Sequence, residues 1–449
     1  MADYVHRIAQ ALDSMDPTIS TPFDGPPPSY AASRRSSGVP PHRVFTEHQF
    51  HLSSRGSNSP WATLNVLSRS PNSTQLPTFL EGDKITGSFI LDLDQPESIA
   101  CVRAVAKGQV IPGPAERDAF TFVELTSILW SKDNGKLRGH YEWPFSLELP
   151  VSVTLAATNH FPAGTYRLPQ SFFERRFPTS VQYTLAVHID RSRFRVNSRV
   201  QTNFTYVPAT RPPPPSPLRQ LAYQQNSPLL GPEADPAGWE QLPPFAVRGT
   251  IFNTRQVQAT CHLALAKPLS YTRGSPIPCI FALTSQDTQA LDLLSSPRAV
   301  SVHLRRRLKP TLPASKRNGI FDANADLSAD LAETIVAASW WPASSSFLGG
   351  GTRHTRQLNG EIQLPPSLKT SCRMAHFAVE YTIEVLPFKA TGFTPFPSPA
   401  HNTHTNISTE PLLKQRVEIV TMFPSGCARP REYAPPQYRI QQYEDPETS

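Results

Sequence analysis

Residues Pro208 to Pro244 read PATRPPPPSPLRQLAYQQNSPLLGPEADPAGWEQLPP, and they separate two halves of the chain that follow the same plan. The consecutive prolines Pro212 to Pro215 have no backbone N–H group and a fixed φ. They therefore favour extended polyproline II over a helix or a central strand. We expect residues 208–244 to form a linker whose middle is irregular coil.

The two halves carry similar segments in the same order. These segments are EGDKITGSFILDL (81–93) and SFFERRFPTSVQYTLAVHID (171–190) in the first half, and YTRGSPIPCIFALTS (271–285) and SLKTSCRMAHFAVEYTIEVLPF (367–388) in the second. The spacing agrees, because 99 residues separate Gly82 from Val181 and 105 separate Gly274 from Val379. The repeating unit is domain-sized, so the pattern indicates a tandem duplication rather than a solenoid. The alternative is a chance similarity between β-rich segments.

The hydrophobic pattern has a period of two residues, which places alternate side chains on one face of a strand. The clearest inward-facing sets are Ala62, Leu64 and Val66; Ile85, Phe89, Leu91 and Leu93; Tyr141, Trp143, Phe145, Leu147 and Leu149; Val181, Tyr183, Leu185, Val187 and Ile189; and Phe377, Val379, Tyr381, Ile383 and Val385. After Asp190 to Arg193 the inward pattern resumes with Phe194, Val196 and Val200, which predicts a β-hairpin. We predict an all-β fold of two tandem antiparallel β-sandwich domains with disordered N- and C-terminal flanks.

A chain of 449 residues is long enough for two domains, each with its own core. The boundaries that we expect are a disordered flank at 1–45, a first sandwich at 46–207, the linker at 208–244, a second sandwich at 245–424 and a disordered tail at 425–449. Both flanks are poor in residues that could offset the entropy of ordering a backbone. Within an insertion at 309–360, Leu327, Leu331 and Ile335 have helical spacing and predict one short helix.

Charge and cysteine usage exclude several classes of partner and site. The net charge is +7, but no basic run resembles a nucleic-acid-binding arm, so we expect no nucleic acid. The 5 cysteines show neither CxxC nor Cys/His spacing, so we expect no zinc site, no disulfide framework and no cofactor. The sequence contains no signal-peptide core and no run of about 18 apolar residues, which predicts a cytoplasmic protein.

Signatures of common enzyme classes are missing from the sequence. No GxSxG, HExxH, P-loop or GxGxxG motif occurs in a usable context. We therefore expect no enzymatic activity. An unrecognised hydrolase, with a Ser/His/Asp site assembled in space from scattered histidines, is the distant alternative.

Two short motifs of the form PPxY lie in the expected flanks, at Pro27–Pro28–Ser29–Tyr30 and Pro435–Pro436–Gln437–Tyr438. Paired prolines present a preformed polyproline II ridge to an aromatic groove, and the tyrosine fills a second pocket. The motif is therefore typical of WW-domain ligands, and we predict WW-domain binding through Pro27, Pro28, Tyr30, Pro435, Pro436 and Tyr438. An accidental match is the alternative. Two copies would raise the avidity for a partner with several WW domains.

Two further sets of residues are candidates for binding and regulation. Arg193, Arg195 and Arg199 fall in one row on the outer face of the predicted hairpin, where they could bind an acidic or phosphorylated cargo segment. A solvated arginine face is the alternative. Ser36 and Ser37 follow paired arginines beside the first PPxY motif, a pattern that suits phosphorylation by a basophilic kinase. An unmodified basic loop is the alternative there.

Six segments, distributed over residues 50–420, carry a family resemblance. They are WATLNVLSRS (61–70), FLEGDKITGSFILDLDQPESI (79–99), GHYEWPFSLELP (139–150), LPQSFFERRFPTSVQYTLAVHIDR (168–191), YTRGSPIPCIF (271–281) and HFAVEYTIEVLPF (376–388). In this order and spacing they resemble the fungal alpha-arrestins, or arrestin-related trafficking adaptors. The resemblance implies an arrestin-like N-domain followed by an arrestin-like C-domain. The long proline-rich linker and the 309–360 insertion depart from the family pattern.

The resemblance also implies a function. An alpha-arrestin adaptor recruits a WW-domain HECT-family ubiquitin ligase to the cytosolic segments of membrane transporters or receptors, which are then ubiquitylated and internalised by endocytosis. Such an adaptor would be cytoplasmic and would associate peripherally with the plasma membrane or endosomes through its cargo. The alternative is a retromer-like arrestin-fold sorting scaffold that recruits no ligase.

Overall fold

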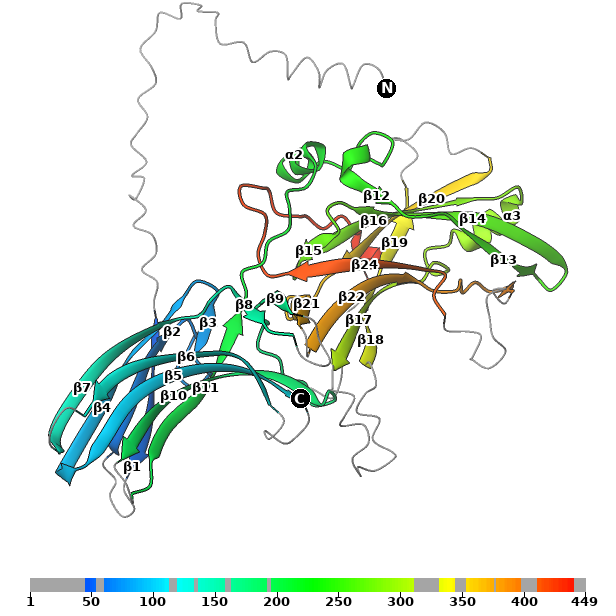
Figure 1. The fold of residues 1–449 in the computed structure, drawn as a ribbon. Helices are drawn as coiled ribbons and strands as arrows, with labels where there is room; N and C mark the ends of the chain where they lie inside the picture. Colours follow the sequence, from blue (N-terminus) through cyan, green and yellow to red (C-terminus); the bar gives the residue numbers. More distant parts are fainter. Residues whose placement is uncertain are drawn as a thin grey trace, which may run out of the picture. The chain divides into compact units, whose positions relative to one another are not determined.

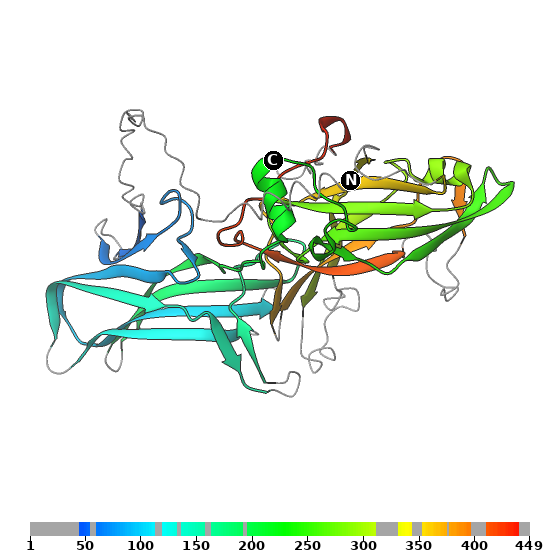
Figure 2. The ribbon, with the colours of Figure 1, turned by 90° about the horizontal axis from the view of Figure 1, so that it is seen from above.

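The computed structural model describes residues 45–53, 60–112, 119–132, 136–157, 163–191, 195–310, 331–343, 353–374, 377–396 and 410–439. Within these ranges the chain forms two β-sandwiches of curved sheets, and Figures 1 and 2 show the strands of each sheet side by side. The predicted all-β fold with two tandem antiparallel β-sandwiches is therefore confirmed. Residues 1–44 of the flank expected at 1–45, and residues 440–449 of the expected tail, lie outside the described ranges.

The first sandwich combines a sheet of strand order β1-β2-β4-β7 with a sheet of order β3-β11-β10-β5-β6. Its strands are β1 (Thr46–Ser53), β2 (Pro60–Ser68), β3 (Thr78–Leu80), β4 (Lys84–Glu97), β5 (Ile99–Pro112), β6 (Phe120–Ser131), β7 (Leu137–Glu148), β8 (Ser152–Leu155), β9 (Gly164–Arg167), β10 (Thr179–Arg191) and β11 (Ser198–Val207). Strands β8 and β9 pair with each other as a separate ribbon.

The second sandwich combines a sheet of order β19-β20-β16-β14-β13-β23, to which β12 adds through β14, with a sheet of order β15-β24-β22-β17-β18, to which β21 adds through β22. Its strands are β12 (Trp239–Gln241), β13 (Phe245–Ile251), β14 (Arg255–Ala266), β15 (Ser270–Thr272), β16 (Pro276–Thr284), β17 (Val302–Pro310), β18 (Leu331–Ala337), β19 (Ser339–Pro342), β20 (Thr355–Gln363), β21 (Cys372–Met374), β22 (Phe377–Val385), β23 (Phe393–Pro395) and β24 (Leu413–Val420). A short helix, α3 (Thr288–Leu294), follows β16.

Burial follows the predicted alternation. The inward-facing residues of β10 are all 2% exposed or less, namely Val181, Tyr183, Leu185, Val187 and Ile189. Each such side chain contributes about 1.5–3 kcal/mol when it is fully buried. The predicted hairpin is present, because β10 and β11 pair antiparallel. The prediction that Val196 faces the core is wrong, because Val196 is 88% exposed and lies in the loop before β11. Phe194 lies outside the described residues.

A tyrosine in the same strand of each sandwich makes the same hydrogen bond. The Tyr183 hydroxyl in β10 donates to the Pro169 carbonyl at 2.7 Å, and the Tyr381 hydroxyl in β22 donates to the Lys369 carbonyl at 2.7 Å. The bonds reach back 14 and 12 residues along the chain, respectively. The two halves therefore share a specific contact, as the predicted repeat requires.

A serine just before these strands is also repeated. The Ser171 N–H donates to the Tyr206 carbonyl at 3.0 Å, and the Ser171 hydroxyl accepts from the Tyr206 N–H at 2.8 Å. The same pair of bonds joins Ser371 to Ile419, at 2.9 and 2.8 Å. In each half these bonds join the segment before the strand that carries the tyrosine, β10 or β22, to the strand that comes last in the sequence of that sandwich, β11 or β24.

The turn glycines of the two halves correspond as well. Gly82 and Gly274 have φ of +84° and +78°, a left-handed conformation that other residues adopt only with strain. Each glycine follows a short strand, β3 or β15, that pairs in parallel with the last strand, β11 or β24. The repeat predicted from the spacing thus extends to backbone conformation and strand pairing.

The linker contains more regular structure than the sequence predicts. Its middle is a helix, α2 (Pro217–Gln225), rather than coil, and a short 3-10 helix, η2 (Pro236–Gly238), follows it. The Arg219 side chain is 3% exposed, lies over the Trp239 ring and donates to the Lys267 carbonyl at 2.9 Å. These contacts hold α2 on the second sandwich. No helix in the described ranges is long and apolar enough to cross a membrane.

The insertion contains a strand where the sequence predicts a helix. Leu331 and Ile335 belong to β18, which pairs antiparallel with β17, and Leu327 lies outside the described residues. Residues four positions apart lie on the same face of a helix and also on the same face of a strand. Leu331 and Ile335 therefore do not distinguish a helix from a strand. Pairing with β17 decides in favour of the strand.

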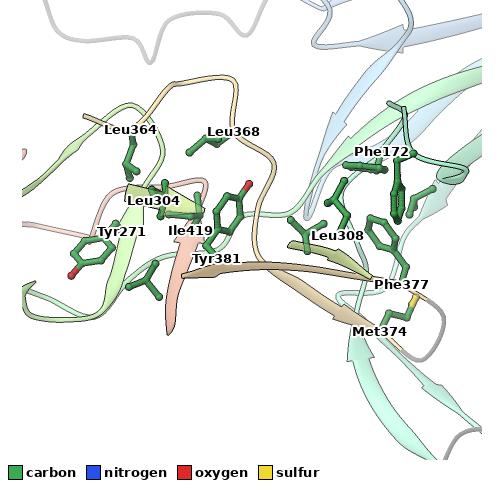
Figure 3. Close-up of a cluster of buried hydrophobic side chains, with 14 of the residues drawn as sticks. Phe172, Tyr271, Leu304, Leu308, Leu364, Leu368, Met374, Phe377, Tyr381 and Ile419 are labelled. Carbon is green, nitrogen blue, oxygen red and sulfur yellow. The ribbon is translucent and has the colours of Figure 1, made fainter. Parts of the chain in front are cut away.

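Side chains of the two sandwiches are in contact. The Arg306 guanidinium on β17 donates two hydrogen bonds of 2.6 Å to the Glu174 carboxylate, and it also pairs with Glu333. Nearby, the rings of Phe172 and Phe377 lie 5.0 Å apart within the buried cluster that Figure 3 shows. The buried apolar residues of the two sandwiches therefore form one continuous cluster.

Candidate functional site

The second PPxY motif forms a compact turn. Pro436–Tyr438 is a 3-10 helix, η4, closed by a hydrogen bond of 2.9 Å from the Tyr438 N–H to the Pro435 carbonyl. Pro435 keeps the polyproline II conformation, with φ −60° and ψ 144°, and Pro436 starts the helix, where its missing N–H group costs nothing. Pro436 and Gln437 are exposed, whereas Pro435 and Tyr438 are half-buried.

The residues just before this motif lie on the second sandwich. The Tyr433 N–H donates to the Glu361 carboxylate of β20 at 2.7 Å, and Ala434 is 5% exposed. The expectation of a free tail from residue 425 is therefore wrong for residues 431–434, which bond to the second sandwich and to α2. The acceptor of the Tyr433 N–H is distant in the sequence, so the local sequence does not reveal it.

An arginine in the same segment contacts the end of helix α2. The Arg431 guanidinium donates to the Tyr223 carbonyl and, at 3.2 Å, to the Asn226 side-chain oxygen. Terminal helix carbonyls lack intrahelical partners and carry partial negative charge, so a cation is favoured there. The Tyr433 hydroxyl adds a hydrogen bond of 3.1 Å to the Ser227 carbonyl, and its ring lies 6.4 Å from that of Tyr223.

Glu361 is the buried carboxyl group at the centre of these contacts. It is 4% exposed, and burial raises its pKa above the usual range. The backbone N–H groups of Tyr433 and Ala434 act in the opposite direction by donating to the charged form, and nearby Glu432 raises the pKa while Arg439 lowers it. The docked segment thus supplies the hydrogen bonds that a buried carboxylate requires.

The other predicted motif residues fall outside the described ranges. These are the first PPxY residues Pro27, Pro28 and Tyr30, together with the candidate phosphorylation sites Ser36 and Ser37. Their predicted roles stay predictions.

The predicted arginine row lies partly within the described structure. Arg195 and Arg199 are exposed, in the β10–β11 loop and on β11, whereas Arg193 lies outside the described residues. Arg199 is opposite His188 of β10, which is opposite Arg103 of β5. Sequence reasoning missed Arg103, because only the pairing register of β5 with β10 brings it into the row.

The surface that carries Arg103, His188, Arg195 and Arg199, here called the arginine face, takes its positive charge from the guanidinium groups. Burial lowers the pKa of His188, and the charges of Arg103 and Arg199 lower it further, so the imidazole is neutral at pH 7. Arg103 pairs with Asp190 at 3.2 Å. Neither Arg195 nor Arg199 makes an ion pair with another described residue. These two side chains are therefore free to bind an acidic group.

A second basic set lies on the second sandwich, but carboxylates offset its charge. Arg305 pairs with Glu384 at 3.2 Å, and Lys309 pairs with Glu380 at 2.5 Å. Arg373 also donates to Glu380, at 2.7 Å. The arginine face of the first sandwich is consequently the less compensated of the two.

Metal-ligating and nucleophilic groups are not gathered at either candidate site. The described residues contain no cluster of three or more His, Cys, Asp or Glu that could hold a metal ion. Burial raises the pKa of the Cys261 and Cys372 thiols to about 12, so neither is a thiolate at neutral pH. In comparisons with known proteins, no family model matches the chain and no curated protein matches it.

Proposed function

We propose that this protein is an adaptor of the alpha-arrestin kind, which recruits a WW-domain HECT-family ubiquitin ligase to membrane cargo. The observation that carries the proposal is a PPxY motif at the surface of a tandem β-sandwich protein, with Pro436 and Gln437 exposed. The six segments that resemble alpha-arrestins also support it. The cargo would be the cytosolic segment of a transporter or receptor, directed to ubiquitylation and endocytosis.

Ligase recruitment would depend on the two PPxY motifs. Pro435 and Pro436 would fill the aromatic groove of a WW domain, and Tyr438 would fill the neighbouring pocket with its ring while its hydroxyl stays at the rim. Pro27, Pro28 and Tyr30 would do the same at the first motif. Binding at one motif raises the effective concentration of the other for a ligase with several WW domains.

Cargo recruitment would depend on the arginine face. Arg195 and Arg199 offer planar guanidinium groups that bind carboxylate or phosphate by paired, charge-assisted hydrogen bonds. Arg193 would extend the row. The protein itself would catalyse no reaction, and it would reach the plasma membrane or endosomes from the cytoplasm through its cargo.

Co-purification from cells tests the proposal. A parent protein should retain a HECT-family ligase, and a Tyr30→Ala, Tyr438→Ala variant should lose it because both motif anchors are gone. Ubiquitylation of the bound membrane protein should fall with it. If the variant retains membrane-protein cargo and coat components, and the parent retains no ligase either, the sorting-scaffold function replaces the adaptor function.

A further inference from the structure

The docked segment and the second PPxY motif are continuous, because Ala434 directly precedes Pro435. We propose that residues 431–434, here called the strap, bind the second sandwich in competition with a WW domain that binds the adjacent motif. This inference rests on the proposed function, since it assigns a regulatory contact to the second ligase-binding motif.

The surface beneath the strap is built to receive it. Glu361 lies near the C-terminal end of β20, is 4% exposed, and accepts a hydrogen bond from the strap backbone. A buried carboxylate without such donors would be costly, so the surface favours the docked state. The C-terminal end of α2 contributes carbonyl and amide oxygens that Arg431 satisfies. The strap therefore has anchors at both Arg431 and Tyr433.

Contacts beyond the strap fold the motif itself. The Arg439 side chain donates to the Ala434 carbonyl at 3.0 Å and pairs with Glu432 at 3.3 Å. These bonds, with the Tyr438 to Pro435 bond, close residues 432–439 into a compact loop in which Pro435 and Tyr438 are half-buried.

A WW domain requires a different state of this loop. It binds consecutive prolines as an extended polyproline II ridge and the tyrosine in an adjacent pocket. In the structure Pro436 is helical, and Tyr438 turns back to bond Pro435. The loop must open before both side chains can enter the groove. The apparent affinity is then reduced by the fraction of molecules in which the strap is undocked.

The test measures the affinity of a single WW domain for the full chain in a Tyr30→Ala background, which leaves the second motif as the binding site. A synthetic peptide of residues 431–445 carries the same motif without the docking surface. The peptide should bind about tenfold more tightly than the chain, a difference of about 1.4 kcal/mol. Isothermal titration calorimetry gives both dissociation constants.

Substitutions in the docking surface leave the sequence of the motif unchanged, so they test release of the strap by itself. Glu361→Gln removes the carboxylate charge at nearly constant size, and Asn226→Gly removes the oxygen that Arg431 contacts while it tolerates the φ of +55°. Each should bring the affinity of the chain at least threefold closer to that of the peptide. Glu233→Gln, at an exposed glutamate of the same linker, is the matched control and should change nothing.

Hydrogen exchange gives a second readout. The N–H groups of Tyr433 and Ala434 should exchange slowly in the free chain and faster once a WW domain is bound. Equal affinities for chain and peptide, variants that behave like the control, or unchanged protection at saturating WW domain would each overturn the competition. If the peptide does not bind the WW domain, the proposed ligase recruitment at this motif is wrong. If the peptide binds but the chain binds equally well, only the competition is wrong.

Discussion

Among single residues, Glu380 is expected to make the stability of the second sandwich depend on pH. Burial by itself would raise the pKa of this carboxyl group, but hydrogen bonds from Lys309 and Arg373, with the charges of Lys309 and Arg416, outweigh it and hold the pKa at about 2. An unfolded chain would give a value of about 4.3. The folded state therefore binds fewer protons than the unfolded state between these two values.

The sign of the effect on stability follows from the lowered pKa. The contribution of Glu380 is fully present above about pH 4.3 and is lost as the pH falls towards about 2. A Glu380→Gln variant cannot titrate at this position. We expect the difference in unfolding free energy between parent and variant to shrink steadily from pH 5 to about pH 2, as measured by urea denaturation. A difference that stays constant across this range would contradict the assignment.

At the scale of single elements, helix α2 tests the packing of the linker. Trypsin cleaves after arginine, and Arg219 is buried in α2, so we expect no cleavage there in the folded chain. Tyr223→Ala should expose the bond, because the loss of a buried aromatic side chain costs about 3–5 kcal/mol and frees the helix. Peptide mapping by mass spectrometry detects the cut.

The control for this helix is Leu221→Ala, which truncates an exposed side chain of α2. This variant should resist cleavage after Arg219 as the parent does. Rapid cleavage after Arg219 in the parent would restore the interpretation of residues 208–244 as irregular coil.

The strands could be predicted from the sequence because their signal is local. Alternation in residues 181–189 specifies which side chains are buried, and Gly82 and Gly274 mark the same turn in both halves. The linker helix and the docked strap could not be predicted, because long-range partners stabilise them. The ring of Trp239 lies under Arg219, and the carboxylate of Glu361 lies under Tyr433.

The candidate sites follow the same division. The PPxY motif at Pro435 to Tyr438 could be identified from the sequence, since the chemistry of a short ligand lies in consecutive residues. Its folded turn could not, and neither could the alignment of Arg103 with His188 and Arg199, which depends on strand register. In β18 the sequence pattern is ambiguous. Apolar residues four positions apart fit both a helix and a strand, and only the pairing of β18 with β17 decides for the strand.

For the whole molecule, the contact between the sandwiches includes an ion pair in which Arg306 is buried and the Glu174 carboxylate is partly exposed. Arg306→Ala would leave Glu174 and Glu333 without their shared cation. Removing one partner of a fully buried pair costs about 3–5 kcal/mol, but both carboxylates here are partly exposed and can be hydrated. We therefore expect the free energy of unfolding to fall by about 1–2 kcal/mol. Chemical denaturation of the variant, beside an Arg175→Ala control at an exposed arginine nearby, measures this. Equal stability of the two variants would show that the pair contributes little.

The proposed function requires that both PPxY motifs bind the WW domains of a ligase. The most direct measurement is calorimetric titration of a tandem WW-domain fragment against the parent, the single variants Tyr30→Ala and Tyr438→Ala, and the double variant, with circular dichroism to verify the fold. We expect each single variant to bind more weakly than the parent, and the double variant, folded like the parent, not to bind. A folded double variant that binds the fragment as tightly as the parent would contradict the proposed function.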